Sequence, residues 1–172
     1  MRVPYLLKPG DNHLPEMPIL AKWVNNKINT CSEAISLARE LEKGSAEFYK
    51  NLAERTADNK DLFLSFAEEN EKYVKQIERT YYGVISDALE GCFDFSLDRK
   101  DYSLETELAG NATLAEEIQG AMKIEAKIIE FYNVAAEQSK SLMADIPRAF
   151  KLVVKKRSKR QSTLKSLAGE KE

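Results

Sequence analysis

Two glutamates, Glu42 and Glu125, are the residues of this sequence whose positions point most directly to chemistry. Each lies on a stripe of residues spaced three or four apart, which places side chains on one face of a helix. The stripes are Ala38, Glu42, Ser45, Tyr49 and Met122, Glu125, Ile129, Tyr132. An ionised carboxylate in an apolar core costs free energy unless a cation or a metal ion neutralises it. The two stripes therefore predict a shared source of positive charge.

Four helices are predicted to position these carboxylates. The chain has 172 residues, 43% of them apolar, with only 7 Gly and 5 Pro, which fits one all-α domain with a core. Helical spacing predicts helices at about residues 32–57, 60–82 and 114–139, and a fourth that begins after Asp145. Ser32 is the predicted N-cap of the first helix. Residues 91–113 then form a long crossover between two helix pairs, a standard topology of four-helix bundles.

The predicted core is a set of stripes, one from each helix. Its members are Ile35, Ala38, Leu41, Ser45, Tyr49 and Leu52 in the first helix; Phe63, Phe66, Asn70, Tyr73, Ile77 and Tyr81 in the second; Ile118, Met122, Ile129, Tyr132 and Ala136 in the third; and Phe150, Val153, Leu164 and Leu167 in the fourth. Arg157 and Arg160 lie in the middle of the last stripe.

The chain divides into a Pro-rich N-terminal arm at residues 1–30, the bundle at residues 31–168 and a charged tail at residues 169–172. Four of the five prolines lie within the first eighteen residues, which excludes a long helix there. Trp23 indicates that the arm docks onto the bundle or onto a partner subunit. Together with the aromatic residues of the crossover, it predicts a subunit interface and a homodimer.

The first and third helices share a sequence motif. Residues 41–54 and residues 124–137 both read E-x4-EFY-x3-AE after one apolar residue, at an offset of 83. Phe63 and Phe66 correspond to Phe150 and Val153 at an offset of 87. Each helix pair is therefore interpreted as one copy of a duplicated hairpin.

An inward glutamate followed by an FY pair, in two equivalent helices, resembles the rubrerythrin branch of the ferritin-like superfamily. The residues that carry the resemblance are Glu42 with Phe48-Tyr49 and Glu125 with Phe131-Tyr132, and the similarity covers roughly residues 32–168. It implies a ferritin-like four-helix bundle. In that family the second and fourth helices each add Glu-x-x-His, which completes a di-iron site that reduces peroxide or reacts with oxygen.

This sequence departs from the family at four of the six ligand positions. By the resemblance, the metal-site positions are Glu42, Asn70, Tyr73, Glu125, Arg157 and Arg160. The sole histidine, His13, lies in the arm and cannot supply both imidazoles. No CxxC pair is present for the rubredoxin-type iron centre that rubrerythrins often append.

The two arginines suggest what replaces the metal. A guanidinium binds a carboxylate through two parallel hydrogen bonds, so Arg157 and Arg160 are expected to pair with Glu42 and Glu125. These four residues form the predicted Glu–Arg cluster. It would keep the register of the bundle and require neither metal nor other cofactor. The Asn70 amide and the Tyr73 hydroxyl are expected to take up remaining donors and acceptors, with Tyr49, Tyr132 and Glu69 surrounding the cluster.

Several alternatives stay open. The glutamates could be partly solvated, and the arginines could extend to water from a loosely packed end of the bundle. A metal could be held by Glu42, Glu125 and Glu69. In functional terms, the first hypothesis is a protein with a binding or structural role. The alternatives are a peroxidase or oxidase that uses iron or a single metal with an atypical ligand set, and a protein that binds a small anion in the former substrate cavity.

One segment of the chain is strongly basic. From Arg148 to Lys165 there are eight bases and no acid, so the other residues carry −10 because the whole chain carries −2. Internal pairing with the acidic helices is the expected use of this asymmetry. Nucleic-acid binding is not expected, since no aromatic residues interleave with the bases to stack on single strands.

Other chemistry finds little support. Cys31 and Cys92 form no close pair, which argues against a thiolate metal site or a disulfide framework. A single histidine excludes a Ser-His-Asp triad in the core, and no GxxxxGK or GxGxxG element is present. No signal-peptide core and no apolar run near the ~20 residues of a membrane span occurs, which predicts a cytoplasmic protein without a membrane anchor.

Overall fold

Four helices of 25 residues each form the framework of the molecule. The computed structural model describes residues 26–84, 95–141 and 145–169. The helices are α1 (Cys31–Arg55), α2 (Lys60–Val84), α4 (Leu114–Gln138) and α5 (Asp145–Gly169). Two short strands, β1 (Lys27–Ile28) and β2 (Leu97–Asp98), and a 3-10 helix, η2 (Arg99–Tyr102), complete the described elements.

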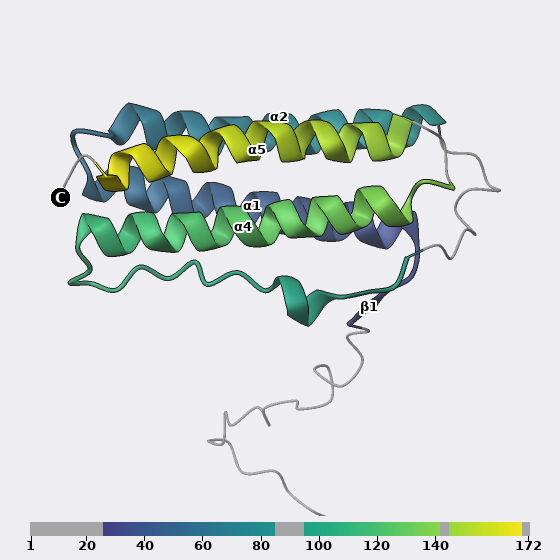
Figure 1. The fold of residues 1–172 in the computed structure, drawn as a ribbon, viewed down its shortest axis with the longest axis horizontal. Helices are drawn as coiled ribbons and strands as arrows, with labels where there is room; N and C mark the ends of the chain where they lie inside the picture. Colours follow the sequence, from purple (N-terminus) through teal and green to yellow (C-terminus); the bar gives the residue numbers. More distant parts are fainter. Residues whose placement is uncertain (1–25, 85–94, 142–144, 170–172) are drawn as a thin grey trace, which may run out of the picture.

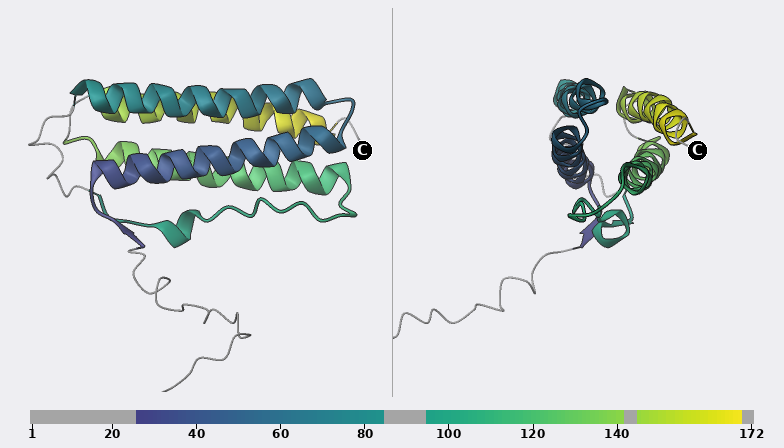
Figure 2. Two further views of the ribbon diagram at one scale, coloured as in Figure 1. Left: turned by 180° about the vertical axis from the view of Figure 1, so that it is seen from behind. Right: turned by 90° about the vertical axis from the view of Figure 1, so that its left-hand side faces the viewer.

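The helices pack as two antiparallel hairpins, α1 with α2 and α4 with α5 (Figure 1). The end-on view in Figure 2 shows α2 beside α5 and α1 beside α4, so the core lies between the two hairpins. The described part of the chain is therefore a mostly helical four-helix bundle. None of its helices combines the length and apolarity that crossing a lipid bilayer requires.

Residues 95–113 run along the outside of the bundle, on the side of α1 and α4 that faces away from α2 and α5 (Figures 1 and 2). They lead from the end at which α2 finishes to the end at which α4 begins. Tyr102 in this segment packs edge-on against Phe131 of α4, with ring centroids 5.3 Å apart.

The starts of α1 and α4 are set by the same local signal. Thr30 caps α1 and Thr113 caps α4, and each forms a capping box with the glutamate three residues later, Glu33 or Glu116. The prediction of Ser32 as the N-cap was wrong, because Thr30 Oγ1 accepts from the Glu33 backbone N–H while Glu33 Oε2 accepts from the Thr30 backbone N–H. These boxes are also 83 residues apart, so they belong to the internal repeat.

The boundary between arm and bundle lies earlier than predicted. β1 pairs with β2 in antiparallel register, Ile28 is fully buried, and the Arg99 N–H donates to the Asn26 carbonyl at 2.8 Å. Residues 26–30 therefore belong to the folded unit. Likewise, Gly169 is the last residue of α5 and not the start of the tail. Trp23, His13 and the predicted docking of the arm lie outside the described residues, as does Cys92.

The predicted core is confirmed in α1 and α2, where every residue of the two stripes is buried. In α4, Met122 and Ile129 are only partly buried, whereas Ile124 and Ile128 fill the core. Residues 95–113 cover a further side of α4 and shift its buried face toward those positions. Leu167 of α5 is also only half-buried.

Candidate functional site

The Glu–Arg cluster lies in the core, where all four helices of the bundle contribute to it. Glu42 comes from α1, Glu125 from α4, and Arg157 and Arg160 from α5; Asn70 of α2 lies against them. Each of these five residues is at most 2% exposed. The alternatives of solvated glutamates and of arginines that extend to water are therefore wrong.

Arg157 bridges the two glutamates. Its Nε donates to Oε1 of Glu42 at 3.1 Å and its Nη2 donates to Oε2 of the same carboxylate, which makes the pair bidentate. On its other side, Nη1 donates to Oε2 of Glu125 at 2.8 Å. One guanidinium thus joins carboxylates from the two repeat-related helices.

Arg160 lies beside this pair. Its Nη1 is 2.8 Å from Oδ1 of Asn70 and 3.2 Å from Oε1 of Glu125. Its Nη2 donates to Oε2 of Glu69 at 2.8 Å and to the Phe66 carbonyl at 3.2 Å. The guanidinium also stacks over the Phe66 ring, 4.6 Å from its centroid. Its Nε has no hydrogen-bond partner among the described residues.

Two tyrosines complete the glutamates' hydrogen bonds, each from the opposite half of the repeat. The Tyr49 hydroxyl of α1 donates to Oε1 of Glu125 at 2.7 Å, and the Tyr132 hydroxyl of α4 donates to Oε1 of Glu42 at 2.9 Å. Burial raises the pKa of both tyrosines well above the ordinary value, and the neighbouring carboxylates raise it further. Both hydroxyls therefore stay protonated and act as donors.

The predicted neighbours Asn70 and Tyr73 have different roles. Asn70 fulfils the prediction, because its Oδ1 accepts from both arginines and its Nδ2 donates to the Glu42 carbonyl at 3.2 Å. The Tyr73 hydroxyl does not bond to the cluster and instead donates to Oε2 of Glu69 at 3.0 Å. Its hydroxyl therefore reaches the cluster only through Glu69, while the Tyr73 ring lies beside both arginines, 5.7 Å from Cζ of Arg157 and 5.6 Å from Cζ of Arg160.

The cluster is electrically balanced, with two guanidinium groups and two carboxylates. Burial alone would lower the pKa of Arg157, but the carboxylates of Glu125 and Glu42 raise it well above its ordinary value. Burial raises the pKa of Glu42, against the opposing effects of Arg157 and Tyr132. We assign Glu42 as a carboxylate, because Oε1 accepts from Arg157 and Tyr132 while Oε2 accepts from Arg157.

A metal ion does not fit these residues. The oxygens of Glu42 and Glu125 are already engaged by guanidinium and hydroxyl donors, and Glu69 bonds to Arg160 and Tyr73 instead of joining the two glutamates. At an effective dielectric constant near 20, a unit charge ~4 Å from a like charge costs ~4 kcal/mol, so two arginines strongly oppose a cation here. No group of three or more His, Cys, Asp or Glu suited to a metal occurs in the described ranges.

One buried carboxylate was missed by the sequence analysis. Glu117 of α4 is 4% exposed, and its Oε1 lies 2.9 Å from Nε of Arg55 at the end of α1. Arg55 also donates to the carbonyls of Ala109 and Gly110, which ties α1 to the segment before α4. The available signal was the position of Glu117 eight residues before Glu125, two helical turns away on the same side.

The predicted internal pairing of the basic segment holds only in part. Arg157 and Arg160 pair inside the bundle, and Arg148 lies 3.6 Å from Asp145. The other bases of the segment point outward, and none forms an ion pair within the described part of the chain: Lys151, Lys155, Lys156, Lys159 and Lys165. Lys156 instead lies over the Tyr73 ring, 5.4 Å from its centroid.

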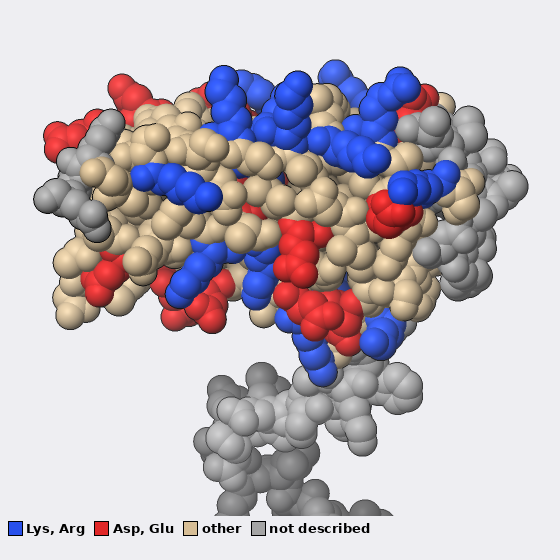
Figure 3. All heavy atoms as spheres, in the orientation of Figure 1, with Lys and Arg blue, Asp and Glu red and all other residues tan. Residues whose placement is uncertain are grey.

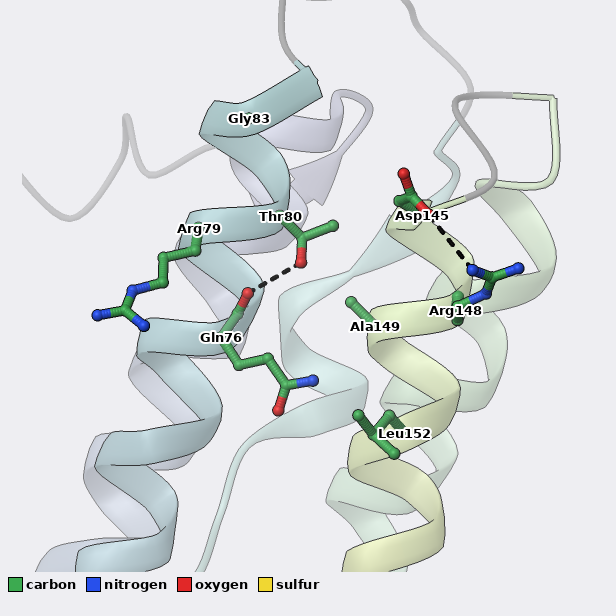
Figure 4. A pocket seen from close by; sticks show the side chains of 8 residues that line it. All are labelled: Gln76, Arg79, Thr80, Gly83, Asp145, Arg148, Ala149 and Leu152. Atoms are coloured by element: carbon green, nitrogen blue, oxygen red, sulfur yellow. Dashed lines mark hydrogen bonds and ion pairs between the residues drawn. The ribbon is translucent and has the colours of Figure 1, made fainter.

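No residue of the Glu–Arg cluster lines either of two hollows on the surface of the described residues. The first, about 390 Å³, lies between the end of α2 and the start of α5. Figure 4 shows that Arg79 and Arg148 at its rim point away from it, so Gln76, Thr80 and Leu152 line its interior. The second, about 980 Å³, lies between residues 103–113 and α4.

No protein-family model, curated protein or solved structure matches this chain. The described residues show a mostly helical architecture of four α-helices with a small two-stranded sheet.

Proposed function

We propose that this chain is a ferritin-like protein related to the rubrerythrins, in which the Glu–Arg cluster has taken the place of the di-iron centre. Its role is then structural or binding, and not catalysis at the former metal site. The observation that carries the proposal is the position of Arg157, whose guanidinium bridges Glu42 and Glu125. In the ancestral site, the equivalent carboxylates from the same two helices would help to hold the metal, and its charge would neutralise them.

The duplication supports the ancestry. Tyr49 stacks on Phe63 with centroids 6.2 Å apart, and the corresponding pair, Tyr132 and Phe150, lies 5.8 Å apart. The two hairpins thus repeat a local aromatic contact as well as a sequence motif. Residues 91–113 correspond to the long crossover that the ferritin-like topology requires between its hairpins.

The substitutions on α2 and α5 also agree with the proposal. Asn70 and Tyr73 are three residues apart, as are Arg157 and Arg160, so both pairs retain the spacing of Glu-x-x-His. Asn70 and the two arginines lie around the glutamates, where ligands would converge. Positive side chains supply the charge that neutralises the carboxylates, which leaves the core balanced without a metal.

The geometry of the cluster supports the two alternative functions, a metal-dependent peroxidase or oxidase and a small-anion-binding protein, less well. A peroxidase or oxidase would need a metal beside Arg157 and Arg160, which repel it. Small-anion binding would need several free guanidinium donors. Arg157 and Arg160 already make four hydrogen bonds each, and only the buried Nε of Arg160 has no partner among the described residues.

Elemental analysis tests the proposal. Protein expressed with added iron and then stripped of loosely bound ions should contain no iron above the buffer blank while remaining folded by circular dichroism. Iron or manganese near one equivalent per chain would overturn the proposal and restore the enzyme hypothesis.

A further inference from the structure

Two oppositely charged surfaces of the bundle have no oppositely charged partner among the residues that the structure describes. The basic face consists of the exposed bases of α5: Arg148, Lys151, Lys155, Lys156, Lys159 and Lys165. Figure 3 shows Lys and Arg side chains gathered along the edge of the molecule formed by α2 and α5. Apart from the contact of Arg148 with Asp145, these bases form no ion pair with the described residues. Their charge is therefore available to a partner.

The acidic hollow is the second surface. It is the hollow of about 980 Å³ beneath residues 103–113, and its acidic lining residues are Glu105, Glu107, Glu116, Glu117 and Glu130. Two bases, Lys123 and Lys127, also line the hollow, and the Lys127 Nζ donates to the Ser103 carbonyl at 2.8 Å, so acids still outnumber bases in the lining. Glu117 is neutralised by Arg55, but Glu105, Glu107 and Glu130 are exposed and form no ion pair with any described residue. Apolar side chains, including Phe48, Leu104 and Leu108, line the same hollow.

The two surfaces lie on opposite sides of the bundle. In the end-on view of Figure 2, α2 and α5 form one side, and residues 95–113 cover the other. The basic face of a chain therefore cannot reach its own acidic hollow, but it can reach that of a second copy. We propose that the basic face of one copy docks into the acidic hollow of another.

The spacing of the charges supports this partner. Lys151, Lys155 and Lys159 follow at intervals of four residues, which places them ~6 Å apart along the helix axis. From Ser103 to Ala109, exposed and half-buried residues alternate, as in an extended chain with one side outward. Glu105 and Glu107 are therefore ~7 Å apart on the outer side. The spacing of the lysines along α5 is therefore close to the spacing between Glu105 and Glu107.

Lysine is also suited to the walls of the hollow. Its apolar stem can lie along Leu104 and Leu108 while the ammonium group reaches a carboxylate at the rim. Because the interface joins two different surfaces, each docked pair of copies leaves one basic face and one acidic hollow free. The assembly therefore grows into a ring or an open chain, unlike the symmetric homodimer expected from the sequence. This inference is independent of the proposed function.

The weight-average mass of the full chain, measured by light scattering and sedimentation, tests the docking. We expect a mass above the 19.5 kDa of one chain at low salt and a fall toward it in about 1 M salt, where the screening length is roughly 3 Å. Lys155→Glu/Lys159→Glu and Glu105→Lys/Glu107→Lys should each be monomeric at low salt. An equimolar mixture of the two variants should associate again, because the unchanged basic face of the second variant can dock into the unchanged acidic hollow of the first.

The matched control is Lys60→Glu/Lys140→Glu, which makes the same change in net charge at exposed positions outside both surfaces. It should associate like the wild type. A wild-type chain that stays monomeric at every concentration would overturn the proposal. So would an assembly whose mass is unaffected by the two charge-reversal variants, or a mixture of them that fails to associate. Anionic polymers that bind the basic face of a monomeric wild-type chain would indicate a different partner and also overturn it.

Discussion

The Tyr132 hydroxyl of α4 lies 2.9 Å from Oε1 of Glu42 in α1. In the internal repeat, Glu42 is the counterpart of Glu125, which lies on the same helix as Tyr132. Tyr49 makes the reciprocal bond to Glu125. Each half of the repeat therefore completes the buried carboxylate of the other half. This exchange ties the two hairpins together at the point where burial of charge is most costly.

Tyr132→Phe should lower the free energy of unfolding by about 1.5–3 kcal/mol, the range for a hydrogen bond to a charged group. The ring and its packing remain, so the loss reports the bond to Glu42. Urea unfolding followed by circular dichroism measures it. Tyr82→Phe is the control, because Tyr82 is 64% exposed; equal small losses in both variants would show that the buried hydroxyl contributes little.

Arg157→Ala should cost about 3–5 kcal/mol, because it leaves two buried carboxylates without their shared cation. Thermal and urea unfolding report the loss, with the exposed Arg148→Ala as control. Arg157→Met combined with Glu42→Leu and Tyr132→Phe should recover part of the loss, since apolar groups replace the charged pair and the hydroxyl that bonds to it, while Glu125 keeps Arg160. An unchanged melting curve for Arg157→Ala would contradict the cluster's role in stability.

Glu69 makes stability depend on pH. Burial alone would raise the pKa of its carboxyl, but the hydrogen bond and charge of Arg160 lower it below the ordinary 4.5. The folded state therefore binds a proton at lower pH than the unfolded state. The stability that Glu69 contributes is present above pH 4.5 and is lost as pH falls through the lowered value.

Urea unfolding of the wild type and of Glu69→Gln, at intervals from pH 3 to pH 7, tests this pH dependence. The difference between the two proteins should appear as pH rises toward about 4.5 and stay constant above it. Glu68→Gln is the matched control, as Glu68 is an exposed neighbour on the same helix. A difference that grows with falling pH would have the wrong sign.

Restoring the ligands should restore metal binding. Asn70→Glu, Tyr73→His, Arg157→Glu and Arg160→His together place Glu-x-x-His on α2 and on α5, opposite Glu42 and Glu125. We expect this quadruple variant to retain iron through chelation that strips the wild type. The measurement is elemental analysis of protein shown to be folded by circular dichroism. A folded variant that holds no more iron than the wild type would refute the alignment of these four positions with the ligand positions.

The local pattern of the sequence was sufficient to place Glu42 and Glu125 inside the bundle. Helical periodicity is a property of neighbouring residues, so it identifies which side chains share a face without knowledge of the partner helices. The presence of Arg157 and Arg160 on an apolar stripe then determined that two cations accompany two carboxylates. The predicted helix boundaries were also close, because caps and turns are local.

Only the tertiary structure decided which groups meet. The packing of the two hairpins determines three contacts that helical spacing does not predict. Tyr132 bonds to Glu42, Tyr73 bonds to Glu69, and Arg55 pairs with Glu117. The shift of the α4 core from Ile129 to Ile128 depends on the segment that covers its flank. Charge counting predicted that the α5 lysines pair with acidic helices, but within the described residues these lysines form no ion pair, and only the two buried arginines and Arg148 do. The spacing of residues along one helix carries no information about distances between residues on different helices, because the packing of all four helices determines those distances.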